Sequence, residues 1–142
     1  MREVPLPHHF FASLHKVVFA IDRHANSLFA DEHSHFSEFL IMNALLCSED
    51  ASQQTIATYL NITPAAVSRR IDSLVHRGLA KRIEDPKSRR SNRISLTQTG
   101  KKELSRMRNI LQRGFKKQVA SVSKKEMEVT CKILEVLLTS FN

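Results

Sequence analysis

One short stretch limits the possible folds of this chain most strongly, the segment ITPAAVSRRIDSLVHRGL at residues 62–79. Thr63 followed by Pro64 is typical of a helix start, because a threonine hydroxyl can cap the helix and proline needs no backbone N–H at the first position. Gly78 is typical of a helix end. Between them, apolar residues recur with helical spacing at Val67, Ile71, Leu74 and Val75. The segment therefore predicts a short helix with one buried face.

The opposite face of this helix is small and polar near its N-terminus. It carries Pro64, Ala65, Ser68, Arg69 and Asp72. A helix with small exposed residues can enter the major groove of DNA, which is about 12 Å wide, and arginine can donate two hydrogen bonds to guanine. This face is suited to approach a surface closely and read part of it. Considered alone, the pattern also fits an ordinary amphipathic helix in an α-helical domain.

Another short helix is predicted directly before it. Ser52 is expected to cap a helix that ends at Leu60, with Ile56, Ala57 and Leu60 facing inward. The connection at Asn61 and Ile62 is tight, so the two helices form a helix-turn-helix.

A basic β-hairpin is predicted after Gly78, where the apolar period changes. LAKRIE at 79–84 and NRISLT at 92–97 are the two strands, and DPKSRRS at 85–91 is the loop. The loop carries Lys87, Arg89 and Arg90, and arginine is favoured in a narrow minor groove. The alternative is a charged turn that keeps the hairpin soluble. Asp72 or Asp85 could pair with Arg89 or Arg90 and hold the hairpin, and the sequence does not choose between them.

Charge along the chain favours an anionic partner. The 142 residues carry a net charge of +8, yet residues 1–50 carry −4, whereas residues 51–93 and 94–142 carry +6 each. Nucleic acid is the first candidate for such a surface, and a solvated basic face is the alternative. The two cysteines are too few for a disulfide framework and favour a reducing compartment. The sequence contains no apolar run long enough to span a membrane and no apolar signal-peptide core, so a cytoplasmic protein without a membrane partner is predicted.

The hairpin would be a wing beside the helix-turn-helix, and long apolar stripes on both sides of this region predict a homodimer. Helices are expected from about Phe10 to Asp31, over FSEFLIMNALL at 36–46, from Thr97 or Thr99 through a stripe that reaches Phe115 and Val119, and from a capping box at Ser123 to Phe141. Pro5 and Pro7 suggest an irregular start before the first of them. These stripes exceed what one small core can cover, although a self-contained bundle is the alternative.

The predicted fold is mainly α with a two- to three-stranded β wing. Residues 51–97 would form the DNA-binding region, and residues 1–50 and 98–142 the dimerisation region.

The run from Phe39 to Leu104 resembles the MarR family of winged-helix transcription regulators. The resemblance rests on the ITPAAVSRRID helix, the RGLAKR step, the DPxxRR wing and the LTxxG start of the next helix. Ser88 stands where the family pattern usually has Asp before the wing arginines. The resemblance implies a homodimer on a near-palindromic double-stranded DNA operator, acting as a repressor released by a small effector.

The candidate site residues fall into four groups. Those expected at base edges are Pro64, Ala65, Ser68 and Arg69. Those expected at phosphates are Ser52, Gln53, Gln54, Thr63 and Arg70. Those expected at the minor groove are the tip cations Lys87, Arg89 and Arg90. An effector pocket of the family type would be lined by His9, Leu14, His15, Phe36 and Met42.

Other chemistry finds less support in the sequence. Six histidines lie in the first 35 residues, but only His33 and His35 form an ordered pattern, so pocket-lining or surface roles are favoured over a metal site. Cys47 and Cys131 are expected to be buried structural thiols rather than oxidant sensors. No phosphate loop, nucleophile elbow or zinc-protease motif is present, so no enzyme activity and no cofactor are predicted.

Two functions remain as alternatives to a regulator. A winged helix can serve as a protein-interaction scaffold for an acidic partner, and dependence of duplex binding on salt and on palindromic spacing would separate the two. An architectural DNA binder without an effector is the second alternative, and a ligand that shifts operator affinity would separate that one.

Overall fold

The computed structural model describes residues 6–30, 34–48, 51–85 and 88–141, with the side chains of Leu6 and of residues 85–92 left out of the description. The order of elements is α1 (Leu6–Leu28), α2 (Phe36–Cys47), β1 (Ala51–Ser52), α3 (Gln53–Leu60), α4 (Pro64–His76), β2 (Ala80–Asp85), β3 (Ser88–Leu96), α5 (Gln98–Gly114) and α6 (Lys124–Ser140). The chain divides into two compact units, residues 1–111 and residues 112–142. The predicted mainly helical fold with a small β wing is confirmed.

The core of the first unit is built around α2, which is apolar on most sides as its sequence predicts. Ile41, Met42 and Leu45 of α2 are buried together with residues of α3, α4, the sheet and α5. Burying a side chain of this size contributes about 1.5–3 kcal/mol. The largest fully buried side chains among the described residues are Phe29, Ile41, Met42, Ile56, Val67, Ile71, Leu74, Ile94, Leu104 and Met107. This core joins residues on both sides of the predicted boundaries at residues 50 and 97.

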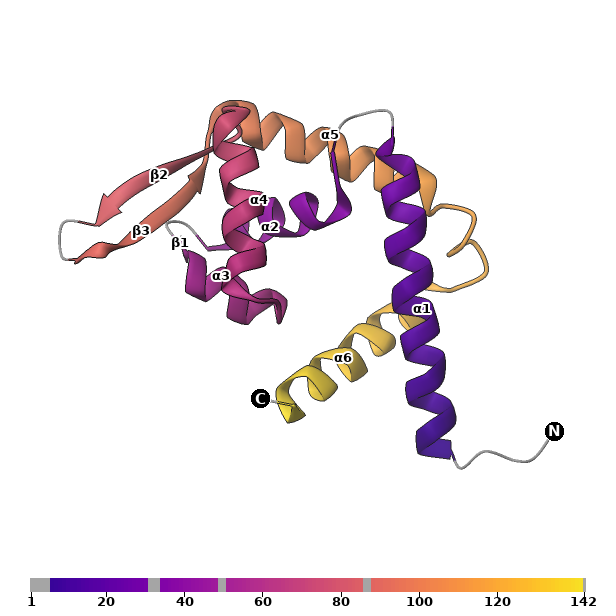
Figure 1. Cartoon of the computed structure of the whole chain (residues 1–142). Coiled ribbons are helices and arrows are strands. Elements are labelled where there is room, and N and C mark those ends of the chain that lie inside the picture. The colour runs from indigo at the N-terminus through magenta and orange to yellow at the C-terminus, as the bar shows by residue number, and fades with distance from the viewer. Residues whose placement is uncertain (1–5, 31–33, 49–50, 86–87, 142) are drawn as a thin grey trace. The chain divides into compact units, whose positions relative to one another are not determined.

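The wing is a three-stranded antiparallel sheet in the order β1-β3-β2. Lys81 pairs with Ser95 and Arg82 pairs with Ile94 across the hairpin. The predicted loop at 85–91 is longer than the observed connection, because β2 continues to Asp85 and β3 begins at Ser88. Figure 1 shows this hairpin extending away from α3 and α4.

The terminal helices differ from their predicted bounds. Helix α1 begins at Leu6, because Pro7 lies in the first turn, where its missing N–H costs no intrahelical hydrogen bond. Helix α5 ends at Gly114, so Phe115 and Val119 lie in the turns that follow rather than in a continued stripe. The capping box of α6 is present as predicted, with Glu126 N donating to Ser123 Oγ at 3.3 Å and Ser123 N donating to Glu126 Oε2 at 2.8 Å.

Much of the predicted apolar face of α1 is not covered by the chain itself. Among the described side chains of α1 only Ala25 is buried, joined by Phe29 just after the helix ends, whereas Phe10, Val18 and Phe19 are exposed. In the second unit, no residue of α6 is buried. None of the described helices combines the length and the apolar character needed to cross a bilayer.

Candidate nucleic-acid interface

The helix-turn-helix forms through the local signals found in the sequence. Ser52 Oγ accepts the backbone N–H of Thr55 at 3.1 Å, and Thr63 Oγ1 accepts that of Ala66 at 3.2 Å, so both predicted N-caps are confirmed. Asn61 ends α3 in the left-handed region at φ 52°, a conformation that asparagine tolerates better than most residues. The turn between α3 and α4 is therefore short and fixed at both ends.

Helix α4 has the two faces that its sequence predicts. Val67, Ile71 and Leu74 are buried in the core. On the other face the candidate base readers are accessible, since Pro64, Ala65 and Arg69 are exposed and Ser68 is half-buried. The N-terminal half of α4 thus presents small residues and one guanidinium to solvent.

An ion pair between the buried carboxylate of Glu38 and the half-buried Arg77 links the C-terminal end of α4 to the start of α2. Arg77 Nη1 donates to Glu38 Oε2 at 2.9 Å, and Ser73 Oγ donates to Glu38 Oε1 at 3.0 Å. Arg77 Nη2 also donates to Ser34 Oγ at 3.2 Å. The Glu38 side chain is only 3% exposed, so its charge depends on these partners. The available sequence signal was a single carboxylate inside the apolar run FSEFLIMNALL, and it was missed.

Helix α4 is also linked to the wing. Asp72 on its exposed face forms an ion pair with Arg82 of β2. A pairing of Asp72 or Asp85 with Arg89 or Arg90 stays a prediction, because the side chains of Asp85, Arg89 and Arg90 lie outside the description. Reading helix and wing are therefore held together at the base of the hairpin.

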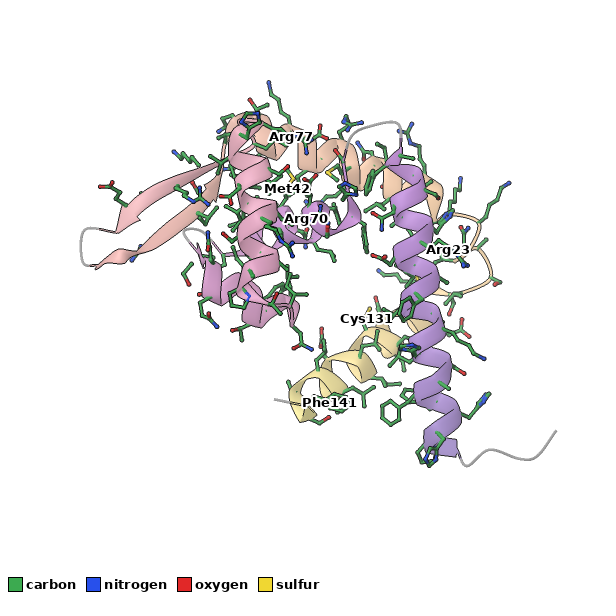
Figure 2. The ribbon with its side chains drawn as sticks, in the orientation of Figure 1. Arg23, Met42, Arg70, Arg77, Cys131 and Phe141 are labelled. Atoms are coloured by element: carbon green, nitrogen blue, oxygen red, sulfur yellow. The ribbon has the colours of Figure 1, made fainter. Side chains whose placement is uncertain are left out.

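The LTxxG motif seats α5 against the end of α4. Thr97 Oγ1 donates to the Gly78 carbonyl at 2.7 Å and accepts the Gly100 N–H at 3.0 Å. A Cβ on Gly100 would overlap the carbonyl oxygen of Leu79. Gly78 itself has φ +70°, which favours glycine. Figure 2 shows Arg77 at this same end of α4, beside the start of α5.

The remaining candidate DNA contacts are only partly placed. Gln54 is exposed, whereas Gln53 and Arg70 are half-buried, and Figure 2 shows Arg70 midway along α4. Lys87 lies outside the described residues. Arg89 and Arg90 belong to the backbone of β3, and their side chains lie outside the description. The roles of all twelve residues stay predictions.

A single chain does not gather the five predicted effector-pocket residues. Met42 is fully buried in the core, and Leu14 and Phe36 are half-buried. His9 and His15 are exposed on α1, eleven or more residues before Asn26, whose side chain accepts a hydrogen bond from the backbone N–H of Phe36 at the start of α2, and this separation is at least about 15 Å along the helix. None of the five lines either of two surface cavities that other residues form. Their effector role stays a prediction.

The cysteines and histidines are also placed. Cys47 and Cys131 are both exposed, so the expectation of buried thiols was wrong: Cys47 is the last residue of α2, and Cys131 lies on α6, which has no buried residue. His33, with Asp31 and Glu32, lies outside the described residues, and His35 caps the start of α2. Among the residues that the structure describes, no three His, Cys, Asp or Glu side chains could share a metal ion.

Comparison with known proteins agrees with this geometry. Residues 36–91 match the model of the MarR family. The chain is 24% identical over 106 residues to an uncharacterized HTH-type transcriptional regulator, YdgJ, of Bacillus subtilis (strain 168), a match that covers 75% of this chain and 65% of that protein.

Solved structures share the fold over nearly the whole chain. The transcriptional regulator BldR from Sulfolobus solfataricus has a TM-score of 0.84 at 20% identity, over 96% of this chain and 98% of that one. A mutant of MarR from E. coli, solved in complex with operator DNA, has a TM-score of 0.78 at 19% identity, over 94% of both chains. MarR family regulators are DNA-binding transcription factors, and the expectation of no enzyme activity stays a prediction for this chain. The chain thus matches the MarR family over residues 36–91 and shares the fold of solved MarR structures.

Proposed function

We propose that this protein is a dimeric repressor that binds a near-palindromic double-stranded DNA operator and is released by a small-molecule effector. The observation that carries the proposal is the two-sided character of α4. Its N-terminal half exposes Pro64, Ala65 and Arg69, while its C-terminal end is held by the ion pair between Glu38 and Arg77. A DNA partner is consistent with action in the cytoplasm.

In this proposal α4 enters the major groove. Arg69 donates to a guanine, while Pro64, Ala65 and Ser68 allow close approach to base edges. Ser52 and Thr63 stand at the starts of α3 and α4, where backbone N–H groups favour phosphate oxygens. The phosphate contacts are completed by Gln53, Gln54 and Arg70. Lys87, Arg89 and Arg90 of the wing supply the minor-groove contact.

The dimer is supported by uncovered apolar surface in both units. On α1, Val17, Val18 and Phe19 are 51–62% exposed. On α6, Val136 is 67% exposed and Leu138 is 60% exposed. Monomeric soluble proteins rarely leave such contiguous stripes open, and a second copy of the chain offers the same stripes in return.

Sedimentation of the full chain tests the dimer. The mass of a dimer should persist on dilution into the low micromolar range, and Leu138→Glu should shift the population toward monomer. Lys132→Glu, on the same helix but outside the apolar face, is the matched control and should leave the dimer intact. A soluble wild-type monomer that still binds duplex DNA tightly would contradict the dimer.

The salt dependence of duplex binding tests the wing. Each neutralised phosphate contributes about 0.9 to the slope of log K against log salt concentration. The variant Arg89→Ala/Arg90→Ala should therefore flatten the slope of the dimer by up to about 4, because it removes four arginines. Lys124→Ala/Lys125→Ala removes the same charge from α6 and should change the slope little. Equal effects of the two variants would mean that the wing makes no specific contact.

A further inference from the structure

Asp72 lies on the exposed face of α4, and the proposed function does not use it. It follows Ala65 by seven positions, so the two side chains point in nearly the same direction from the helix axis. Arg69 precedes it by three positions, which is about 4.5 Å along the axis at about 1.5 Å per residue. Successive base pairs are about 3.4 Å apart, so Asp72 stands near the base pair beside the one that Arg69 is proposed to read.

A carboxylate on a face that approaches DNA is unexpected. DNA phosphates repel negative charge, and residues 51–93 otherwise form a basic region with a net charge of +6. The side chain of Asp72 is 58% exposed, so burial in the core does not account for it. Its ion pair with Arg82 is therefore either its whole role or the support for a contact with DNA.

The ion pair with Arg82 prepares this carboxylate for such a contact. Arg82 Nη2 donates to Asp72 Oδ1, and the positive guanidinium offsets the negative charge that would face the phosphates. The contact also restricts the carboxylate to one orientation, because it joins α4 to β2. Among the side chains that the structure describes, none donates to Asp72 Oδ2, which stays available as an acceptor.

We propose that Asp72 is a base-reading residue that selects cytosine in each operator half-site and is positioned by Arg82. This proposal rests on the proposed function. An ionised carboxylate can only accept hydrogen bonds. In the major groove, cytosine presents only the N4 donor, guanine and thymine present acceptors, and adenine presents one donor and one acceptor. Asp72 therefore accepts from cytosine N4 and disfavours guanine and thymine, whose acceptors would leave the carboxylate unpaired.

The alternative is that Asp72 only holds the wing. In that case its replacement would change the affinity for all duplexes, because the wing contacts phosphates and the minor groove. The base preferred at the position beside the guanine of Arg69 would then stay the same. A change of base preference is thus the readout that a purely structural role would not produce.

The variant Asp72→Asn separates the two roles. Asparagine has nearly the same size, and its amide oxygen can still accept from Arg82, so the link to the wing is kept. Its amide group both donates and accepts, which matches N6 and N7 of adenine. Selection of the full-length protein on a random DNA pool should give cytosine with wild type and adenine with Asp72→Asn, at one position per half-site. Asp72→Glu keeps an acceptor-only carboxylate and should still prefer cytosine to adenine.

Fluorescence anisotropy on duplexes that differ only at this position gives the magnitude. The ratio of the affinities for the cytosine and adenine duplexes should change about tenfold or more between wild type and Asp72→Asn. Arg82→Met removes the link and keeps the carboxylate, so it should lower the cytosine preference without introducing a preference for adenine. Lys81→Met removes the neighbouring cation of β2, which does not pair with Asp72, and should keep the wild-type preference.

The outcomes that overturn the proposal are distinct from failure of the proposed function. If wild type enriches a sequence and Asp72→Asn enriches the same one, Asp72 reads no base and this proposal alone is overturned. An adenine preference that also appears in Arg82→Met would assign the change to the wing and overturn it as well. If wild type enriches no sequence, the proposed function fails, and this proposal fails with it.

Discussion

Arg77 and Glu38, 39 positions apart in the chain, form an ion pair at 2.9 Å in which the carboxylate is buried and the guanidinium is half-buried. The pair connects the C-terminal end of α4 to the first turn of α2. Ser73 of α4 donates to the same carboxylate, so the buried charge of Glu38 is stabilised by two side chains, those of Ser73 and Arg77. The orientation of the reading helix therefore depends on contacts far from its exposed face.

Arg77→Met should destabilise the protein by about 1.5–3 kcal/mol, because it removes the charged donor described at the buried Glu38 carboxylate and leaves the neutral hydroxyl of Ser73. Urea denaturation measures the free energy of unfolding. The double variant Glu38→Gln/Arg77→Met should regain part of the loss, since the buried charge is then gone. Arg108→Met, which removes a guanidinium hydrogen-bonded to the neutral Asn43, should cost less. If Arg77→Met and Arg108→Met lower the free energy of unfolding equally, the ion pair between Glu38 and Arg77 does not contribute specially to stability.

Replacing Gly78 or Gly100, the two glycines that lie near the start of α5, should destabilise the protein for different reasons. Gly100→Ala should cost about 1–3 kcal/mol or more, because its Cβ overlaps the Leu79 carbonyl oxygen and backbone must move. Gly78→Ala should cost about 1–2 kcal/mol, because the site is open but its φ is +70°. Gly78→Asn should lose less stability than Gly78→Ala. Gly100→Ser should lose as much stability as Gly100→Ala. Thermal or urea unfolding of the four variants checks the pattern.

Glu103 should contribute an acid-dependent part of the stability. Arg106 donates to its carboxylate at 2.9 and 2.7 Å and holds the pKa of Glu103 below its ordinary value of 4.5, with help from the charges of Arg106 and Arg77 and against the effect of partial burial. A carboxyl whose pKa is lower in the folded state stabilises above its unfolded pKa, and this contribution disappears as pH falls through the folded pKa.

Glu103→Gln should therefore lower the free energy of unfolding at pH 6, by up to about 1 kcal/mol for a pair this close to the surface, and should lower it less at pH 3. Arg106→Met should show the same pH dependence, since it removes the same interaction. If the free energies of unfolding of wild type and Glu103→Gln differ by the same amount at every pH from 6 to 3, the pair with Arg106 does not shift the titration of Glu103.

Arg69→Ala should weaken binding to the preferred duplex by about 1–3 kcal/mol and relax discrimination at one position in each half-site. Arg70→Ala, its half-buried neighbour, should weaken binding to all duplexes alike, since a phosphate contact carries little sequence information. Fluorescence anisotropy with single-base variants of the duplex separates the two effects. Unchanged base preference in Arg69→Ala would remove it from the set of base readers.

The reading helix could be predicted from the sequence because its signals are local. Thr63, Pro64 and Gly78 act within one turn of the positions they define, and the burial of Val67 and Ile71 follows from helical spacing alone. The pairing of Glu38 with Arg77 could not be predicted, because many arginines could reach a buried carboxylate and only the packing of α2 on α4 selects one.

Other features depend on tertiary contacts that the local sequence pattern does not reveal. The exposure of Cys47 follows from where α2 ends relative to α3, not from the apolar residues around the cysteine. The tighter wing follows from strand pairing that continues to Asp85 and Ser88, although Pro86 and the polar residues around it suggested a longer loop. The ion pair between Asp72 and Arg82 joins a helix to a strand residue 10 positions later, so no local pattern marks it.

Selection of bound duplexes from a random DNA pool tests the central claim most directly. The account predicts one enriched sequence made of two inverted half-sites whose centres lie about one helical turn, or 10–10.5 base pairs, apart, because a two-fold dimer presents two α4 helices to one face of the duplex. Changing the spacing by about half a turn should abolish the preference. A pool that shows no enriched sequence, or a single half-site with no dependence on spacing, would contradict the account.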